Sequence, residues 1–587
     1  QGQLLQSDAN GQLKVNVAQT LNNSSGVISA AGSAQLNVTQ LNNSAAKLLV
    51  DKQLGIKADD INNTQGTVYT DDSLNIIAKH GINNQQGILA AKQAVYVKAQ
   101  SLNNTEGTVQ SEQSNLDLSI SGALDNQRGK LLSNQDISIQ SLSLNNASGT
   151  IFSNQGLNLD IDGGIENQSG TIAANNNISV NAQSLDNTSG QIRSEKQHLN
   201  IITQQNLNND SGILVAAKNV AITAQDLSSQ NGQIQAGQHA DLTVQSLDNT
   251  AGTLYADGQL KLNALAHINN QDGVIAANQG FNLNAASLSN NAGKLIAQQS
   301  AMQLDIANEL SNIKGEISAA QDLTMNSGHW NNVEGKVVAG QKLHLNTATL
   351  DNHLGVIYAQ DQSKIVATGQ VNNTSGVIAS KQIDLTSQSL LNDLGKIRAE
   401  QGSLNLSVDN ELSNLSGEIF AQQEANLKAQ QINNQKGKIQ RILKTTIETN
   451  TLDNQSGTIY SQDQLQLLAQ SAIQNQQGII AAQKDLQINS TDLNNEQGII
   501  QSEQGRADLT VQGALNNHQG ELFASKGLNV VAQGIDNRLG QISSLEKLNL
   551  DSQLQTLNNE SGKILADQIL LKTGLLNNNS GLIQSNS

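Results

Sequence analysis

Histidines and acidic residues are the side chains of this sequence best suited to bind a metal ion or to move a proton. The eight histidines show no His-x-x-x-His or similar spacing, although a metal site needs ligands that converge. The adjacent carboxylates Asp59/Asp60 and Asp71/Asp72 invite comparison with glycoside hydrolases, which hold two carboxyl groups roughly 5–9.5 Å apart. Because the chain has no cysteine, disulfides and cysteine-based metal sites are excluded.

Aromatic side chains are the second group that could carry a function. Seven of the ten aromatic residues stand three positions after a glycine that recurs along the chain. In a strand that alternates inward and outward side chains, this position points outward. Exposed rings stack on sugars or dock partner proteins, whereas scattered rings that only shield a corner bind nothing. The candidate surface contacts are the tyrosines of this set: Tyr69, Tyr255, Tyr358 and Tyr460.

The recurring glycine closes a motif that consists of an aliphatic residue, Asn or Asp, Asn, two variable residues and Gly. Residues 82–87 (INNQQG) and 452–457 (LDNQSG) are two of its copies, and it returns every 19 to 24 residues. There are 29 glycine positions, of which only Ala46 is not Gly, and Asn stands three residues earlier in 27 of 28 complete motifs, the exception being Ser229. Such regularity is typical of repeat proteins.

Short alternating apolar segments fill the rest of each repeat, as in Leu74/Ile76. Period-two alternation predicts strands, and no 3.6-residue apolar stripe persists. A unit of this length with three short strands cannot bury its own apolar face, so each strand pairs in parallel with the same strand of the next repeat. The sequence therefore predicts an all-β protein, a single continuous parallel β-helix (β-solenoid) of about 29 coils with roughly 20 residues per coil.

The nearly constant repeat length bears on catalysis. β-Helical enzymes that cleave polysaccharides use long loops to gather carboxylates, Lys and Arg over one sheet, and this sequence leaves no room for such a loop. We therefore interpret the acidic pairs as solvated corners, and we expect no catalytic residue, no cofactor and no metal ion. A polysaccharide-degrading enzyme is the least favoured of the functions considered.

The motif predicts the corner at which the chain leaves one sheet and enters the next. Such a turn favours left-handed backbone angles, which Gly adopts freely. The Asn three residues earlier is expected to turn its amide inward, where amides stacked at the coil spacing donate to one another. The expected turn residues are Gly26, Gly87, Gly107, Gly190, Gly252, Gly355 and Gly457. The expected ladder residues are Asn23, Asn84, Asn104, Asn126, Asn187, Asn249, Asn352, Asn454 and Asn537.

The net charge disfavours some classes of partner, and the absence of proline is consistent with stacked strands. Thirty-three basic and fifty acidic residues give a net charge of −17 that is spread along the chain, which disfavours a footprint for nucleic acid or an anionic membrane. No apolar run approaches the roughly 18 residues of a membrane span. The absence of proline fits coils that must all donate ladder hydrogen bonds. We expect no nucleic-acid partner and no membrane insertion in this segment.

The spaced L-[ND]-N-x-x-G-x-I-x-A pattern resembles the haemagglutinin repeats of filamentous haemagglutinin-type exoproteins, and also the shaft repeats of contact-dependent inhibition toxins. The resemblance covers essentially the whole chain. It implies a right-handed β-helix that is exported by two-partner secretion, with an outer-membrane two-partner secretion transporter as partner. It also implies a cell-surface or secreted location on the outer-membrane exterior of a Gram-negative bacterium.

The expected function is that of a rigid spacer, which holds a receptor-binding or toxin module away from the producing cell in adhesion or contact-dependent growth inhibition. A receptor on a host or neighbouring cell would be bound by parts outside this segment. The alternative is that the lateral surface is itself an adhesin for host glycans or other filaments. Because neither end shows a polar cap, residues 1–587 are expected to form one shaft domain that is truncated at both ends.

Overall fold

The computed structural model describes residues 2–441 and 443–586. The chain divides into two compact units, Gln1–Gln298 and Gln299–Ser587, and each unit is a stack of short parallel strands. In the described part of the chain every regular element is a β-strand, which confirms the all-β prediction. No helix among these residues is long and apolar enough to cross a membrane.

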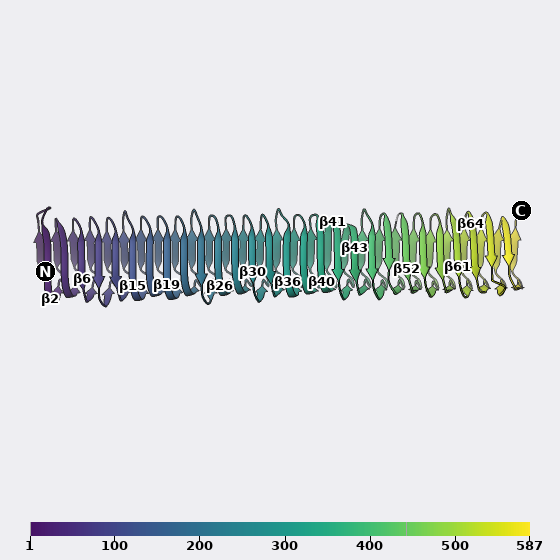
Figure 1. The fold of residues 1–587 in the computed structure, drawn as a ribbon, viewed down its shortest axis with the longest axis horizontal. Coiled ribbons are helices and arrows are strands. Elements are labelled where there is room, and N and C mark those ends of the chain that lie inside the picture. Colours follow the sequence, from purple (N-terminus) through teal and green to yellow (C-terminus); the bar gives the residue numbers. More distant parts are fainter. Residues whose placement is uncertain (1, 442, 587) are drawn as a thin grey trace. The chain divides into compact units, whose positions relative to one another are not determined.

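Each coil contributes three strands, and a coil of the first unit shows the arrangement. Its strands are β11 (Ile88–Ala91), β12 (Val95–Ala99) and β13 (Ser101–Asn103). Strand β11 pairs in parallel with β8 (Thr67–Thr70) of the coil before and with β14 (Thr108–Ser111) of the coil after. Equivalent strands of successive coils thus line up in three strips of parallel strands, as predicted: β11 lies in the first strip, β12 in the second and β13 in the third. Figure 1 shows successive coils in each unit lying side by side.

Some coils lack a break between two of their strands. In the first unit β15 (Leu116–Asp125) and β19 (Leu157–Glu166) each run through the second and third strips. In the second unit β41 (Val356–Ala367) and β43 (Val377–Ser387) run through the first and second strips. These four strands are labelled in Figure 1. The corner between the third strip and the next coil, where the repeated motif lies, separates strands in all four of these coils.

The core of each unit is a column of aliphatic side chains along every strip. In the second strip Leu74, Val95 and Leu116 are Cα partners in successive coils and are at most 1 % exposed. Their inward direction follows from the alternation in the sequence, because successive side chains of a strand point to opposite faces. A coil alone would leave this column open to water, so the burial exists only because coils stack.

Thr445 occupies a core position in the second unit and gives a first prediction. It lies in β52 (Lys444–Thr449) between its Cα partners Ala425 and Leu465, is fully buried, and its Oγ1 has no hydrogen-bond partner. We expect Thr445→Val, which removes the unpaired hydroxyl at nearly constant shape, to raise the local free energy of opening by about 1 kcal/mol. Hydrogen exchange of β52 measures this quantity.

The neighbouring residue supplies the control for this prediction. Thr446 lies in the same strand with a half-buried, outward side chain. Thr446→Val should therefore change the local free energy of opening of β52, as measured by hydrogen exchange, by less than about 0.5 kcal/mol. A Thr445→Val variant that exchanges faster than the parent protein would show that the hydroxyl is satisfied in solution.

Candidate functional site

One corner of every coil follows the same backbone path, and we call it the Asn corner. In the coil that ends at Gly87, strand β10 (Gly81–Asn83) leads into Asn84, whose N–H donates to the carbonyl oxygen of Asn103 in the next coil at 2.7 Å. The N–H of Gly87 donates back to the carbonyl oxygen of Asn84 at 2.9 Å. These two bonds close the turn and attach it to the next coil.

The Asn that stands three residues before the glycine forms an inner ladder of amides. Asn84 Nδ2 donates to Asn104 Oδ1 at 2.7 Å, and Asn104 Nδ2 donates to Asn126 Oδ1 at 2.7 Å. The same Nδ2 group of Asn84 also donates to the carbonyl oxygen of Gly87 at 3.2 Å. All three asparagines are fully buried. Each amide thus connects its own turn to the next coil in a fully buried position, where an unpaired amide would cost about 1–3 kcal/mol.

The structure places all nine predicted ladder residues in this arrangement. Each of them donates its amide N–H to the Oδ1 of the corresponding Asn one coil later at 2.6 to 2.8 Å. Eight are fully buried and Asn23 is 8 % exposed. These donors are Asn23, Asn84, Asn104, Asn126, Asn187, Asn249, Asn352, Asn454 and Asn537.

The predicted reason for the motif glycine is wrong. The only glycines of the described chain with positive φ are Gly280, Gly527 and Gly534, none of which closes an Asn corner. The left-handed residue is the one before the motif glycine, for example Gln86 with φ 55°. This correction applies to every predicted turn residue: Gly26, Gly87, Gly107, Gly190, Gly252, Gly355 and Gly457.

The motif glycine is required by close packing between coils. A Cβ built on Gly87 would overlap the carbonyl oxygen of Asn63 in the preceding coil and would lie 2.6 Å from Asn84 Oδ1 and 2.9 Å from Asn63 Nδ2. The last two atoms are joined by a rung of the amide ladder. A side chain at this position would therefore push into the ladder itself. Ala46, the one natural exception, lies at a turn whose N–H to Asn43 O distance is 3.3 Å, compared with 2.9 Å at Gly87.

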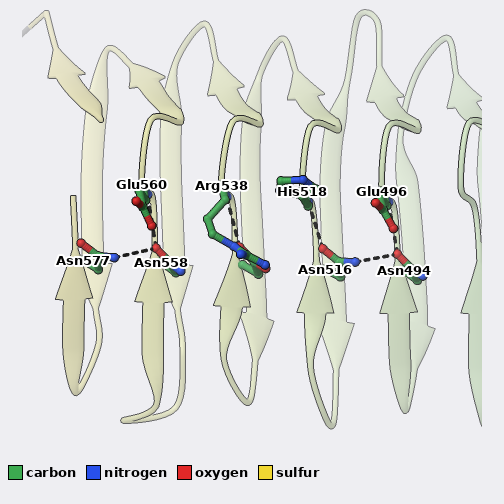
Figure 2. Close-up of polar contacts among 9 residues, drawn as sticks. Asn494, Glu496, Asn516, His518, Arg538, Asn558, Glu560 and Asn577 are labelled. Atoms are coloured by element: carbon green, nitrogen blue, oxygen red, sulfur yellow. Dashed lines mark hydrogen bonds and ion pairs between the residues drawn. The ribbon is translucent and has the colours of Figure 1, made fainter. Parts of the chain in front are cut away.

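A second column of side chains lies outside the ladder, at the Asn or Asp four residues before the glycine. Asn494 Oδ1 accepts from the N–H of Glu496 at 3.2 Å, and Asn516 Oδ1 accepts from the N–H of His518 at 3.0 Å. Asn516 Nδ2 also donates to Asn494 Oδ1 at 2.9 Å. Figure 2 shows these half-buried caps repeating from coil to coil in the second unit. They satisfy a turn N–H that has no other partner within its own turn.

The function of this outer column was missed in the sequence, although a signal for it is present. The outer position holds Asn in most repeats, Asp in six and Ser, Glu, Gln or Leu in the others, whereas the inner position never holds Asp. A cap needs only an acceptor, which both side chains supply, but a ladder amide must also donate. The tolerance of Asp at one position and its exclusion from the other therefore distinguish the two roles within the sequence itself.

Asp536 and Arg538 form the most charged of these caps. Arg538 Nη2 donates to Asp536 Oδ2 at 2.7 Å, and the backbone N–H of Arg538 donates to Oδ1 at 3.1 Å. Burial acts to raise the pKa of the Asp536 carboxyl, but the hydrogen bonds from Arg538 and its charge outweigh this, so the pKa lies below its ordinary value. The ion pair contributes only weakly to stability because the Arg538 side chain is 47 % exposed and the Asp536 side chain is 30 % exposed, so solvent screens their attraction.

This cap predicts a pH dependence. A lowered pKa in the folded state means that the Asp536 carboxylate stabilises the fold above its unfolded pKa, and that this contribution is lost as the pH falls through the folded pKa. We expect Arg538→Gln to raise the pKa of Asp536 toward its ordinary value, as followed by a carboxyl-carbon NMR titration. Arg538→Lys, which keeps the charge and loses the forked donor, should give an intermediate pKa. An unchanged pKa in Arg538→Gln would contradict the assignment.

The four candidate contact tyrosines lie on the first strip with their rings outward. Tyr69, Tyr255 and Tyr460 are half-buried, and Tyr358 is 37 % exposed. Tyr255 Oη donates to Asp257 Oδ1 at 3.1 Å, and burial together with this carboxylate raises the pKa of Tyr255. In neither unit are two of these tyrosines in neighbouring coils, so they do not form one shared aromatic patch.

Each of these rings is followed by alanine at the paired position of the next coil. The Cα partners are Tyr69 and Ala90 in the first unit and Tyr358 and Ala379 in the second. These alanines are only 4 % and 6 % exposed although they point outward. The same pairing holds for Tyr255 with Ala276, Tyr460 with Ala481 and Phe152 with Ala173. The rings therefore cover the small side chain of the next coil.

Asp59 and Asp60, the first acidic pair singled out in the sequence, do not converge on a shared site. Among the described residues, no group of three or more His, Asp or Glu side chains could hold a metal ion. Asp59 lines a surface hollow of about 830 Å³ in the first unit, whose other charged residues are Lys57, Lys79 and Lys98. Asp60 instead lies 3.4 Å from His80 Nδ1. One carboxylate among three lysines is not the pair that glycoside hydrolysis needs.

Comparison with known proteins gave one kind of match. A family model described as haemagglutinin repeat matches ten segments that together cover residues 8–441 and 443–586. The segments are residues 8–68, 52–128, 114–211, 206–264, 255–324, 303–375, 349–415, 399–441, 443–519 and 504–586. No curated protein and no solved structure matched the chain.

Proposed function

We propose that this chain, which belongs to the haemagglutinin-repeat family, is the structural shaft of a secreted or cell-surface adhesin-type exoprotein. In this role it holds a receptor-binding or toxin module away from the cell that produces it. The observation that supports the proposal most is the Asn corner. The same buried amide rung and the same backbone bonds join most successive coils of each unit, so the fold is built to extend.

The lateral surface also supports the proposed role as a structural shaft. Its aromatic rings cover alanines of the next coil, and the hollow beside Asp59 mixes one acidic with three basic side chains. The family suggests the finer features of the proposal: export through an outer-membrane two-partner secretion transporter, a location outside the outer membrane of a Gram-negative bacterium, and a role in adhesion or in contact-dependent growth inhibition. Nucleic acid and membrane lipid are not proposed as partners of this segment.

In-frame deletion of whole coils tests the shaft proposal. Removing residues 88–107 joins Gly87 to Thr108, which are equivalent to Gly107 and Thr108 in the parent chain, so an intact Asn corner leads directly into β14. We expect such deletions to leave the protein folded and to reduce binding or toxin delivery gradually with the number of coils removed. Removal of residues 88–97 is the matched control, since half a coil destroys the register and should unfold the neighbouring coils.

The exposed edges of the tyrosine rings support one alternative, in which the lateral surface is itself an adhesin. In that case Tyr255, Tyr358 and Tyr460 changed to Ser should abolish binding to cells, and deletion of coils that lack a tyrosine should have no effect. Retained binding in the triple variant, together with a loss that scales with length, would support the shaft function instead.

A further inference from the structure

One Asn corner of the first unit lacks both of its side-chain amides. At the corner that ends at Gly232, Ser228 replaces the outer Asn or Asp and Ser229 replaces the inner Asn. Ser229 is fully buried like the asparagines that it replaces. At this corner, therefore, the effect of losing both the inner ladder and the outer column can be examined in a single coil.

The inner ladder is interrupted at Ser229. Asn209 Nδ2 donates to Ser229 Oγ at 3.2 Å, which is longer than the 2.7 Å of the rung between Asn84 and Asn104. On the other side of the gap, Asn249 Oδ1 is buried and has no hydrogen-bond partner. A serine side chain is too short to donate across to the next coil while it also accepts from the previous one. The gap thus leaves an unsatisfied buried acceptor, which favours any local opening that lets water reach it.

The outer column is rerouted at the same place. In the corners whose outer residue is Asn or Asp, the N–H two residues later is bound by that side chain, as Thr250 is by Asp248 at 3.0 Å. Here the N–H of Gln230 donates at 2.9 Å to Oδ1 of Asp210 in the preceding coil, and Ser228 Oγ donates to the same oxygen at 2.5 Å. The turn is therefore held from outside and has lost its internal cap.

We propose that the corner from Ser228 to Gly232 is a built-in weak joint, at which the first unit opens more readily than at its other Asn corners. The joint requires only the hydrogen-bond geometry of this coil, and it would exist whether or not the protein serves as a shaft. Its opening exposes the amide of Asn249 and separates the coils on either side of Ser229. A load or a protease that acts on the first unit would find this corner before the others.

Hydrogen exchange with mass spectrometry on the whole chain tests the joint. The N–H groups of Ser229 and Asn231 are bound to Asp248 O and Thr250 O at 2.7 and 2.9 Å, and those of Asn104 and Glu106 are bound in the same way to Asp125 O and Gln127 O at 2.6 and 3.0 Å. Despite this equal bonding, we expect peptides that contain residues 227–232 to exchange about tenfold faster than those that contain residues 102–107.

Two reciprocal variants make the test decisive. Ser229→Asn completes the ladder with the residue found at all the other inner positions, and it should slow exchange at this corner by about tenfold. Asn104→Ser should create a second fast corner at residues 102–107 while leaving residues 227–232 unchanged. Equal exchange at the two corners of the parent protein would overturn the proposal, as would a Ser229→Asn variant with unchanged rates, since a buried water would then already satisfy Asn249.

Discussion

Replacement of Gly87 by valine is expected to lower the local free energy of opening by about 3 kcal/mol or more, which is the cost of severe overpacking in a close-packed interior. The new side chain would meet the carbonyl oxygen of Asn63 and would separate the amides of Asn63 and Asn84, which are 2.7 Å apart in the ladder. Neither neighbour can retreat, because each is bonded to further coils. Hydrogen exchange at residues 63–108 and the midpoint of thermal unfolding measure the loss.

Gly55 provides a matched control for this experiment. It lies in β6 (Leu54–Ala58) with ordinary backbone angles, and a Cβ built on it would meet only Gln35 Cγ, at 4.0 Å. Gly55→Val should be neutral or slightly stabilising, because valine favours strands and glycine has an entropic disadvantage there. If Gly87→Val and Gly55→Val had equal effects, contact between coils would not be the reason for the motif glycine.

Asn495→Asp is expected to be the second severe change, although it alters a single group of atoms. Asn495 is fully buried, accepts from Asn475 Nδ2 at 2.7 Å and donates to Asn517 Oδ1 at 2.8 Å. A carboxylate cannot donate, so it would face the oxygen of Asn517 as an unpaired buried charge. The expected loss is about 3–5 kcal/mol near neutral pH, measured by chemical unfolding and by hydrogen exchange of the neighbouring coils.

The pH dependence of this variant identifies the cause of the loss. Burial raises the pKa of the new carboxyl in the folded state above its unfolded value of about 4. The loss should therefore be smallest below about pH 4, where the carboxyl is protonated and can donate, and should grow as the pH rises through the folded-state pKa. A loss that does not change with pH would indicate a steric effect and would contradict the donor requirement.

The adjacent residue is the control for Asn495→Asp. Asn494 lies in the half-buried outer column, where its Oδ1 accepts from Glu496 N and Asn516 Nδ2. Its Nδ2 also donates to Gln474 Oε1 at 3.2 Å, a part-buried bond that the substitution removes. Natural coils hold Asp at this position, as Asp453 and Asp536 show. Asn494→Asp should change stability by less than about 1 kcal/mol. The same substitution at two adjacent residues thus separates the ladder from the cap.

The coil and its inward residues could be predicted because they depend on local patterns that repeat. Alternation placed Leu74 and Val95 in the core, and the nearly constant spacing aligned them with their partners one coil away. The role of Gly87 could not be predicted in this way, since it depends on where the preceding coil places the carbonyl oxygen of Asn63. The position of that oxygen is set by how the coils stack, and no residue pattern within a single motif indicates it.

The candidate site, too, could be predicted from the sequence only in part. The inner amides were predictable because an Asn at nearly every corner indicates a side chain that both donates to and accepts from its equivalents in neighbouring coils. The covering of Ala90 by Tyr69 was missed because the two residues are 21 positions apart and are brought together only by the pairing of β8 with β11. Comparison of each repeat with the next, in place of comparison with an average repeat, would have shown alanine after five of the seven aromatic residues in this column.

The identity of register from coil to coil also has a genetic consequence. Because Leu89 meets Val68 and Val109 at equivalent positions, unequal crossing-over between two copies of the repeat in the gene joins half-coils that already fit. The product gains or loses whole coils, each about 4.8 Å long, and needs no new packing solution. Length is therefore a trait that recombination can change in small and nearly equal steps.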